Sequence, residues 1–110
     1  MKDKTDKFIT MIGFARRAGK IVYGYDNLRS ARAVKLLSVS DTASDNLKDG
    51  MKKLAEQKRV PLVIAASLEN KAGNNVKALG LTDANMAKAV VDFVSNDESE
   101  QYKLENGSRR

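Results

Sequence analysis

The chain has 110 residues, with 20 Lys and Arg against 14 Asp and Glu, and it contains neither Cys nor His. This length is typical of one domain. The lack of Cys and His excludes zinc fingers, iron–sulfur clusters, disulfide scaffolds and catalytic sites built on a Cys–His or Ser–His pair. The longest apolar run, 60–66, is far shorter than the roughly 20 residues that span a bilayer. We therefore expect a cytoplasmic protein with no membrane partner.

The net charge of +6 is concentrated in the first third of the chain. Residues 1–35 contain three acidic residues and nine basic ones, namely Lys2, Lys4, Lys7, Arg16, Arg17, Lys20, Arg29, Arg32 and Lys35. Such an excess is typical of proteins that bind polyanions, because neutralising phosphates releases counterions. It is also typical of a solvated helix face, so charge alone leaves both interpretations open.

Apolar periodicity predicts two helices and two strands in the first 40 residues. Phe8, Ile12 and Ala15 recur at helical spacing, after a capping residue at Thr5 or Asp6 and before a stop at Gly19. The segments that follow are predicted as a short strand over 21–23, a short helix over 25–32 and a buried strand over 33–40.

The second half of the chain continues the alternation of helix and strand. A Ser/Thr/Asp cluster over 40–45 caps a third helix that ends near Lys58, and Gly50 inside it costs about 1 kcal/mol relative to Ala. The elements expected next are a strand over 61–66, a brief helix capped by Ser67, a strand over 76–81 and a helix from Thr82 to about Val94. Residues 95–110 are charged and poor in core residues, so we expect a mobile tail. The pattern predicts a single domain over 1–94, a three-layer α/β/α sandwich around a four-stranded sheet.

Enzyme signatures are sparse. The glycines within 13–24 are spaced five or more residues apart, which matches neither a dinucleotide-binding nor a P-loop motif. Asp41, Asp45 and Asp49 are spaced four apart, as an acid–base or magnesium site could require, but this spacing is more typical of a solvated helix face. We therefore expect a protein that is not an enzyme and that uses no metal or cofactor.

The segment 24–30, Gly-Tyr-Asp-Asn-Leu-Arg-Ser, is the most specific candidate for a binding site. Its glycine follows a predicted strand, and its polar side chains open a predicted helix. A glycine allows close approach of the backbone, a helix start offers N–H groups, and Asp or Asn can exchange hydrogen bonds with base edges. Asp26 would face a base amine, since phosphate would repel it. The same residues also fit an Asx cap that has no partner.

A longer run around this segment resembles the opening of the bacterial YlxQ-type proteins, members of the ribosomal protein L-seven-Ae/L-thirty-e family. The run is IGFARRAGKIVYG, residues 12–24. Weaker matches follow in the family's order at 25–27, 34–37, 43–46, 60–61, 82–83 and 87–89, so the resemblance spans about residues 8–92. The resemblance implies an α/β/α sandwich with a four-stranded mixed sheet. It also implies docking, without catalysis, on kink-turn RNA, a sharply bent duplex with tandem sheared G·A pairs that is found among structured and ribosomal RNAs. We expect a monomer.

The resemblance carries an RNA-binding role onto particular residues. Gly24 matches the family's glycine, and Asp26 and Asn27 take the positions that read guanine edges. The loop 65–67 corresponds to one that lies over a flipped-out nucleotide, and 41–43 to an additional loop at the same edge. With the neighbouring basic and aromatic side chains, the implied RNA-binding residues are Lys20, Gly24, Tyr25, Asp26, Asn27, Arg29, Ser30, Ala65, Ala66 and Ser67.

Two departures distinguish this chain from the family pattern. Ser30 occupies the position where a lysine is expected, which removes a cation unless Arg29 or Arg32 replaces it. The intervals 24–35 and 67–76 are each shorter by about one helical turn of 3.6 residues. The alternative hypothesis is therefore a protein–protein adaptor on the same fold that no longer recognises kink-turn RNA.

Overall fold

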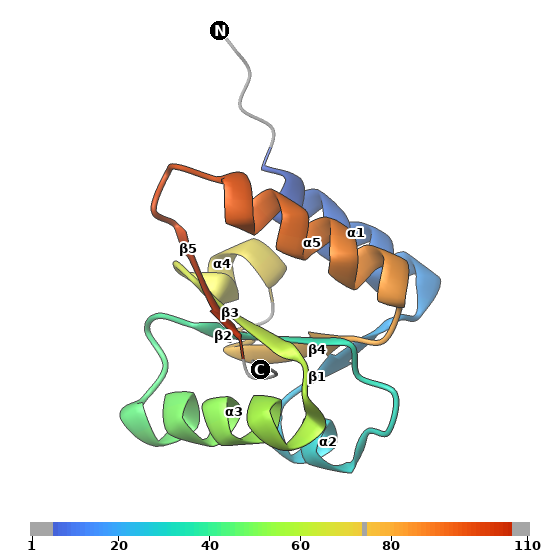
Figure 1. Cartoon of the computed structure of the whole chain (residues 1–110), viewed down its shortest axis with the longest axis vertical. Helices are drawn as coiled ribbons and strands as arrows, with labels where there is room; N and C mark the ends of the chain where they lie inside the picture. Colours follow the sequence, from blue (N-terminus) through green and yellow to red (C-terminus); the bar gives the residue numbers. More distant parts are fainter. Residues whose placement is uncertain (1–5, 74, 107–110) are drawn as a thin grey trace, which may run out of the picture.

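The computed structural model describes residues 6–73 and 75–106, which form five helices and five strands around one mixed sheet (Figure 1). In chain order the elements are α1 Lys7–Ala18, β1 Ile21–Tyr23, α2 Tyr25–Ser30, β2 Leu36–Ser40, α3 Asp45–Lys58, β3 Pro61–Ala65, α4 Leu68–Ala72, β4 Ala78–Leu81, α5 Ala84–Asn96 and β5 Tyr102–Asn106. The strand order is β1-β4-β2-β3-β5. Strands β2 and β3 pair in parallel, whereas the other three pairs are antiparallel. Strands β1, β2 and β3 therefore run in the same direction.

Helices cover both faces of the sheet, so the predicted mixed α/β fold is confirmed. Helices α1, α4 and α5 lie on one face, and α2 and α3 lie on the other (Figure 1). Alternate residues of the central strands point into the two cores, as the pleat of a strand requires. In β2, Leu36 packs under α1 and α5, whereas Leu37 packs under α2 and α3. Both side chains are fully buried.

The prediction of four strands is wrong, because residues 102–106 form a fifth strand. β5 pairs antiparallel with β3 and extends the sheet beyond it. These residues were expected in a mobile tail because the surrounding stretch is charged and short of core residues. Apolar Tyr102 and Leu104 nevertheless alternate with charged Lys103 and Glu105, which is the pattern of an edge strand. Residues 107–110, the end of the expected tail, lie outside the described residues.

The side chain of Tyr102 anchors β5 to the first helix. Its ring centroid lies 4.8 Å from that of Phe8 and 5.8 Å from that of Phe93. Its hydroxyl donates to the carboxylate of Asp6 at 2.6 Å, and the other carboxylate oxygen of Asp6 caps α1 by accepting from the backbone N–H of Phe8. Burial, together with the hydrogen bond to Asp6, raises the pKa of Tyr102. The last strand is thus held by residues near the start of the chain.

Two helix caps differ from the sequence prediction. Asp83, one residue after the expected Thr82, caps α5 by accepting from the N–H of Met86 at 2.9 Å. Ser67 precedes α4 as expected, but its φ of 50° is left-handed and its hydroxyl makes no capping hydrogen bond. The N–H of Leu68 donates instead to the hydroxyl of Ser40, at 3.3 Å, so the cap comes from a neighbouring strand.

Two glycines allow α2 to pack closely against the rest of the molecule. A Cβ added at Gly80 in β4 would lie 2.6 Å from Cδ2 of Leu28, the buried residue of α2. A Cβ added at Gly50 in α3 would lie 3.2 Å from Cε1 of Tyr25, the first residue of α2. The helix-interior glycine at 50 therefore has a packing role. Together these contacts fix the helix that carries the candidate RNA-binding residues.

Candidate nucleic-acid interface

Three loops of the predicted site open from one edge of the sheet. Because β1, β2 and β3 run in the same direction, the residues that follow them meet at their carboxyl ends. We term this the carboxyl edge, defined by residues 24–27, 41–44 and 65–67, and term the opposite side the amino edge. Two strands, β4 and β2, separate β1 from β3. At about 4.8 Å per strand, the first and third loops stand about 14 Å apart.

The turn between β1 and α2 requires its glycine. Gly24 has a φ of 90°, which L side chains adopt only with strain, and its N–H donates to the carbonyl of Ala78 at 2.9 Å. Asp26 and Asn27 are exposed at the start of α2. The side-chain amide of Asn27 donates to the carbonyl of Tyr23 at 2.9 Å, which orients the side chain. The polar residues of this loop therefore stand on a defined backbone at the carboxyl edge.

The last turn of α2 carries a cationic side chain, Arg29, and a short side chain that ends in a hydroxyl, Ser30. The guanidinium of Arg29 lies 5.9 Å from the centroid of the Tyr25 ring, within range of a cation–π contact. The hydroxyl of Ser30 donates to the carbonyl of Asp26 in the same helix, at 3.4 Å. Ser30 thus directs its hydrogen bond inward, and Arg29 is the nearest cation in sequence on α2.

The carboxylate of Glu69, which the sequence analysis did not identify, lies between the other two loops, 41–44 and 65–67. Oε1 of Glu69 in α4 lies 2.6 Å from the hydroxyl of Ser40, and Oε2 lies 2.8 Å from that of Thr42. The hydrogen bond from Ser40 is the main cause that lowers the pKa of Glu69 to about 2, and a backbone hydrogen bond and Thr42 add to it. The carboxylate of Asp41 also accepts from the N–H of Ser67 at 3.0 Å. Loops 41–44 and 65–67 are therefore cross-linked.

Asp41 and Asp45, two of the aspartates considered as metal ligands, have structural roles instead. Asp41 accepts from Ser67, as described above, and Asp45 is the first residue of α3, where the helix dipole favours a carboxylate. Among residues 6–73 and 75–106, no three acidic, His or Cys side chains gather in a way that could hold a metal ion. Within that same part of the chain, no helix combines the length and the apolar character needed to cross a membrane.

Lys20 lies away from the other predicted residues. It precedes β1, and its carbonyl accepts from the N–H of Thr82 at the end of β4. This places Lys20 at the amino edge, whereas Gly24 to Ser30 and Ala65 to Ser67 begin at the carboxyl edge. The sequence placed Lys20 beside the motif because the two are close in the chain. A three-residue strand, about 10 Å long, is enough to separate them.

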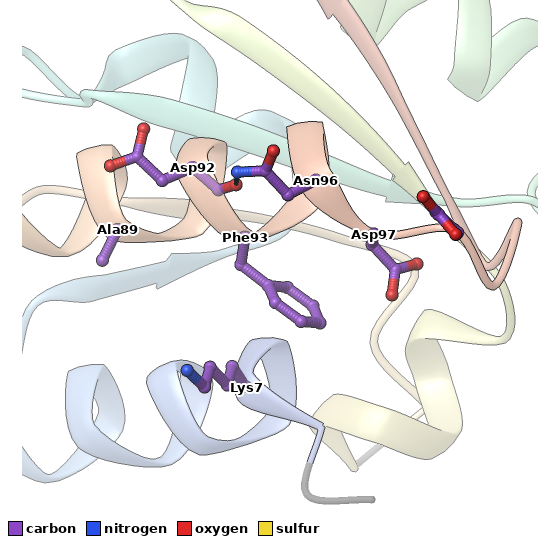
Figure 2. A pocket seen from close by; sticks show the side chains of 7 residues that line it. Lys7, Ala89, Asp92, Phe93, Asn96 and Asp97 are labelled. Atoms are coloured by element: carbon purple, nitrogen blue, oxygen red, sulfur yellow. Dashed lines mark hydrogen bonds between the residues drawn. The ribbon is translucent and has the colours of Figure 1, made fainter.

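An acidic hollow of about 650 Å³ flanks the carboxyl edge between α1 and the end of α5 (Figure 2). It is lined by Lys7, Ala89, Asp92, Phe93, Asn96, Asp97 and Glu98. Figure 2 shows the Phe93 ring pointing from α5 toward α1. The chain then returns to the carboxyl edge, where the carbonyl of Gln101 accepts from the N–H of Ala66. The β5 side of the carboxyl edge is therefore acidic.

Comparison with known proteins finds a similar fold among solved structures. No family model matches the chain, and no curated protein matches it. A solved structure, that of a protein with unknown function from Bacillus halodurans C, superposes with a TM-score of 0.76 at 18% sequence identity. The match covers 84% of this chain and 100% of that chain. At this identity the likeness shows a shared fold.

Proposed function

We propose that this protein binds RNA and docks, as a cytoplasmic monomer and without catalysis, on a bent duplex of the kink-turn type. The proposal is supported by one observation above all. The loops that the resemblance implicates, 24–27, 41–43 and 65–67, open from the ends of three strands that run in the same direction. Segments far apart in the sequence thus share one edge.

The chemistry of this edge suits recognition of base edges more than attraction of phosphates. Asp26 can accept from an exocyclic amine, and Asn27 can both donate and accept. The Asn27 side chain is already oriented by Tyr23, so less conformational entropy is lost on binding. Asp41 ties the loop 41–44 to Ser67, and Glu69 ties the same loop to α4, so the two loops form a rigid support for an unstacked nucleotide.

The proposal predicts recognition of RNA shape. We expect the protein to bind a kink-turn RNA at least tenfold more tightly than the same RNA with Watson–Crick pairs in place of the sheared G·A pairs. Fluorescence anisotropy at two salt concentrations measures both affinities. Asn27→Ala should weaken kink-turn binding by about 1–3 kcal/mol, because the loss of a base contact has that size.

The control for this experiment is Asn85→Ala, which removes an exposed amide from α5 beside the amino edge. This variant should bind both RNAs as the parent protein does. Equal affinity of the parent for the kinked and the straightened RNA would overturn the proposal.

The adaptor hypothesis has support of its own. Ser30 turns its hydroxyl into its own helix, and the acidic hollow with Phe93 at its centre suits a basic, partly apolar protein segment. Under this hypothesis, protein purified from cells carries a stoichiometric protein partner and no RNA. Substituting Asp92 and Asp97 by Asn should then release the partner, whereas under the RNA proposal it should leave kink-turn affinity unchanged or slightly raised.

A further inference from the structure

A cationic residue lies within two residues before each of β1, β2 and β3, the three strands that run in the same direction. Lys20 precedes β1, Lys35 precedes β2, and Arg59 lies two residues before β3. Ile21 and Leu36 both face Leu81 of β4 in the register, so Lys20 and Lys35 occupy the same level of the sheet on either side of β4. Their Cα atoms are separated by two strand spacings, about 10 Å. The amino edge therefore carries a row of positive charge.

The backbone beneath this row is held by the sheet. The N–H of Thr82 donates to the carbonyl of Lys20 at 2.9 Å, and the N–H of Lys35 donates to the carbonyl of Leu81 at 2.7 Å. All three cationic side chains are exposed. The backbone positions of Lys20 and Lys35 are thus set by the sheet, and the exposed side chains can reach a ligand.

A hollow of about 330 Å³ brings a further cation to this edge. It is lined by Lys35, Pro61, Ala84, Ala87, Lys88 and Val91. Helix α5 begins directly after β4 ends, which places its first turns, including exposed Lys88, beside the start of β2 and β3. Lys35 and Lys88 therefore line this hollow together with apolar residues. The apolar residues can accept the face of a sugar while the lysines meet the phosphates on either side of it.

The carboxylates nearest to this edge are largely engaged elsewhere. Asp83 caps α5 through the N–H of Met86, and Glu105 of β5 is half-buried and lies 3.7 Å from the ammonium of Lys103. Glu56 is exposed on α3, less than one turn before Arg59. The β5 side of the carboxyl edge is acidic instead, since Asp97 and Glu98 are near it. Elsewhere along that edge Lys71 and Lys77 lie beside Ala66 and Ser40.

We infer that Lys20, Lys35, Arg59 and Lys88 form a second RNA-binding surface, which contacts the phosphate backbone at the amino edge. A row of cations at fixed spacing matches a linear polyanion, and neutralising several phosphates supplies the affinity. A membrane surface would call for large apolar side chains that insert among lipids, and the exposed ones among the described residues, Ile9 and Phe14, lie on α1. The surface needs no base recognition, so it does not rest on the kink-turn proposal. With both surfaces occupied, the protein bridges two RNA segments.

The inference is tested with a straight duplex RNA that contains no kink-turn, bound to the full chain over a series of salt concentrations. Each lysine that contacts a phosphate contributes about one unit to the slope of log K against log salt. Lys35→Gln with Lys88→Gln should therefore lower the slope by about two units and weaken binding about tenfold or more at 0.1 M salt. Circular dichroism and thermal melting verify that the variant is folded.

The matched control removes the same charge from another place. Lys52→Gln with Lys53→Gln neutralises two exposed lysines in the middle of α3 and should change affinity less than threefold. Equal losses in the two double variants would overturn the inference, because they would reflect net charge alone. Binding by the parent to phosphatidylserine vesicles in preference to duplex RNA would overturn it as well.

The two proposals fail in different measurements. The ratio of the affinities for kink-turn RNA and for straightened RNA reports binding at the carboxyl edge. The double variant Lys35→Gln with Lys88→Gln should leave that ratio unchanged. The salt slope on straight duplex reports the amino edge, and Asn27→Ala should leave that slope unchanged. Equal affinity of the parent for the kink-turn and the straightened RNA would therefore contradict the kink-turn proposal only. The amino-edge surface would still be supported if the double variant lowers the salt slope on straight duplex.

Discussion

Glu69 links two loops through hydroxyl groups that are 27 and 29 residues away in the chain. Its carboxylate accepts from Ser40 and Thr42, and Ser40 in turn accepts from the N–H of Leu68, beside Glu69 in α4. No local pattern signals such an arrangement, because its members come from a strand, a loop and a short helix. The role of Gly24 in its turn could be predicted from the sequence, because the turn depends on the backbone conformation of Gly24 itself. The role of Glu69 could not be predicted in this way.

The lowered pKa of Glu69 predicts a defined pH dependence of stability. A folded-state pKa of about 2, below the ordinary 4.5, means that the folded protein favours the ionised carboxylate. This contribution is present above pH 4.5 and is lost as the pH falls through about 2. In urea unfolding across that window, the parent should lose stability more steeply than Glu69→Gln. Parallel profiles for the two proteins would show that the carboxylate is not held in this way, and Glu98→Gln serves as an exposed control.

The contact between α2 and the sheet depends on one missing side chain. The Cβ of Gly80→Ala would lie 2.6 Å from Cδ2 of Leu28 and 3.1 Å from the carbonyl oxygen of Leu36. The carbonyl of Leu36 belongs to the backbone of β2 and cannot turn aside, so relief requires Leu28 and the α2 helix that carries it to shift away. We expect a loss of about 1–3 kcal/mol in the free energy of unfolding. Binding of kink-turn RNA should weaken as well, because the same helix carries Asn27.

Gly13→Ala is the matched control for this substitution. Gly13 lies in α1, and its nearest neighbour in space, the end of the flexible Arg17 side chain, is 4.0 Å from the added Cβ. Alanine is favoured over glycine within a helix by about 0.5–1 kcal/mol, so this variant should gain stability. Denaturant unfolding of both variants measures the two changes, and a Gly80→Ala protein as stable as Gly13→Ala would contradict the packing described here.

Elements bounded by local signals could be predicted, whereas those defined by distant pairing could not. Helix α1 begins after Asp6, one of the two predicted caps, and ends at Gly19, the predicted stop, and β1 lies between two glycines. Strand β5 lacks such boundaries, and its identity as a strand comes from hydrogen bonding to β3, about forty residues earlier. The cap of α4 fails for the same reason, since the hydroxyl that supplies it, on Ser40, belongs to another element.

At the scale of the whole molecule, charge in the sequence and charge on the surface are distributed differently. The sequence concentrates its excess in residues 1–35, but the fold separates Lys20 from Gly24 and brings Lys35 beside Lys88. Whether two residues share an edge depends on the direction of the strands that carry them. That direction follows from which pairs of strands are parallel and which are antiparallel, and composition along the chain does not reveal it.

The fifth strand predicts the effect of a shortened chain. A chain ending at residue 100 lacks β5, so it exposes the edge of β3 and loses the contacts of Tyr102 with Phe8 and Asp6. We expect a lower midpoint of thermal unfolding and self-association that light scattering detects, because an open strand edge pairs readily with another chain. A chain ending at residue 106 keeps the strand and should remain as stable as the full chain. Equal stability of the two shortened chains would contradict the role assigned to β5.

The bond between Tyr102 and Asp6 also bears on the order of events during synthesis. Asp6 emerges from the ribosome well before its partner, which lies 96 residues later in the chain. Until β5 follows, β3 is the outermost strand of the growing sheet and has no neighbour on that side. Domains fold as units during translation, and in this one the strand that covers β3 is made after the other four. The nascent chain therefore passes through a stage in which a chaperone could recognise its open edge.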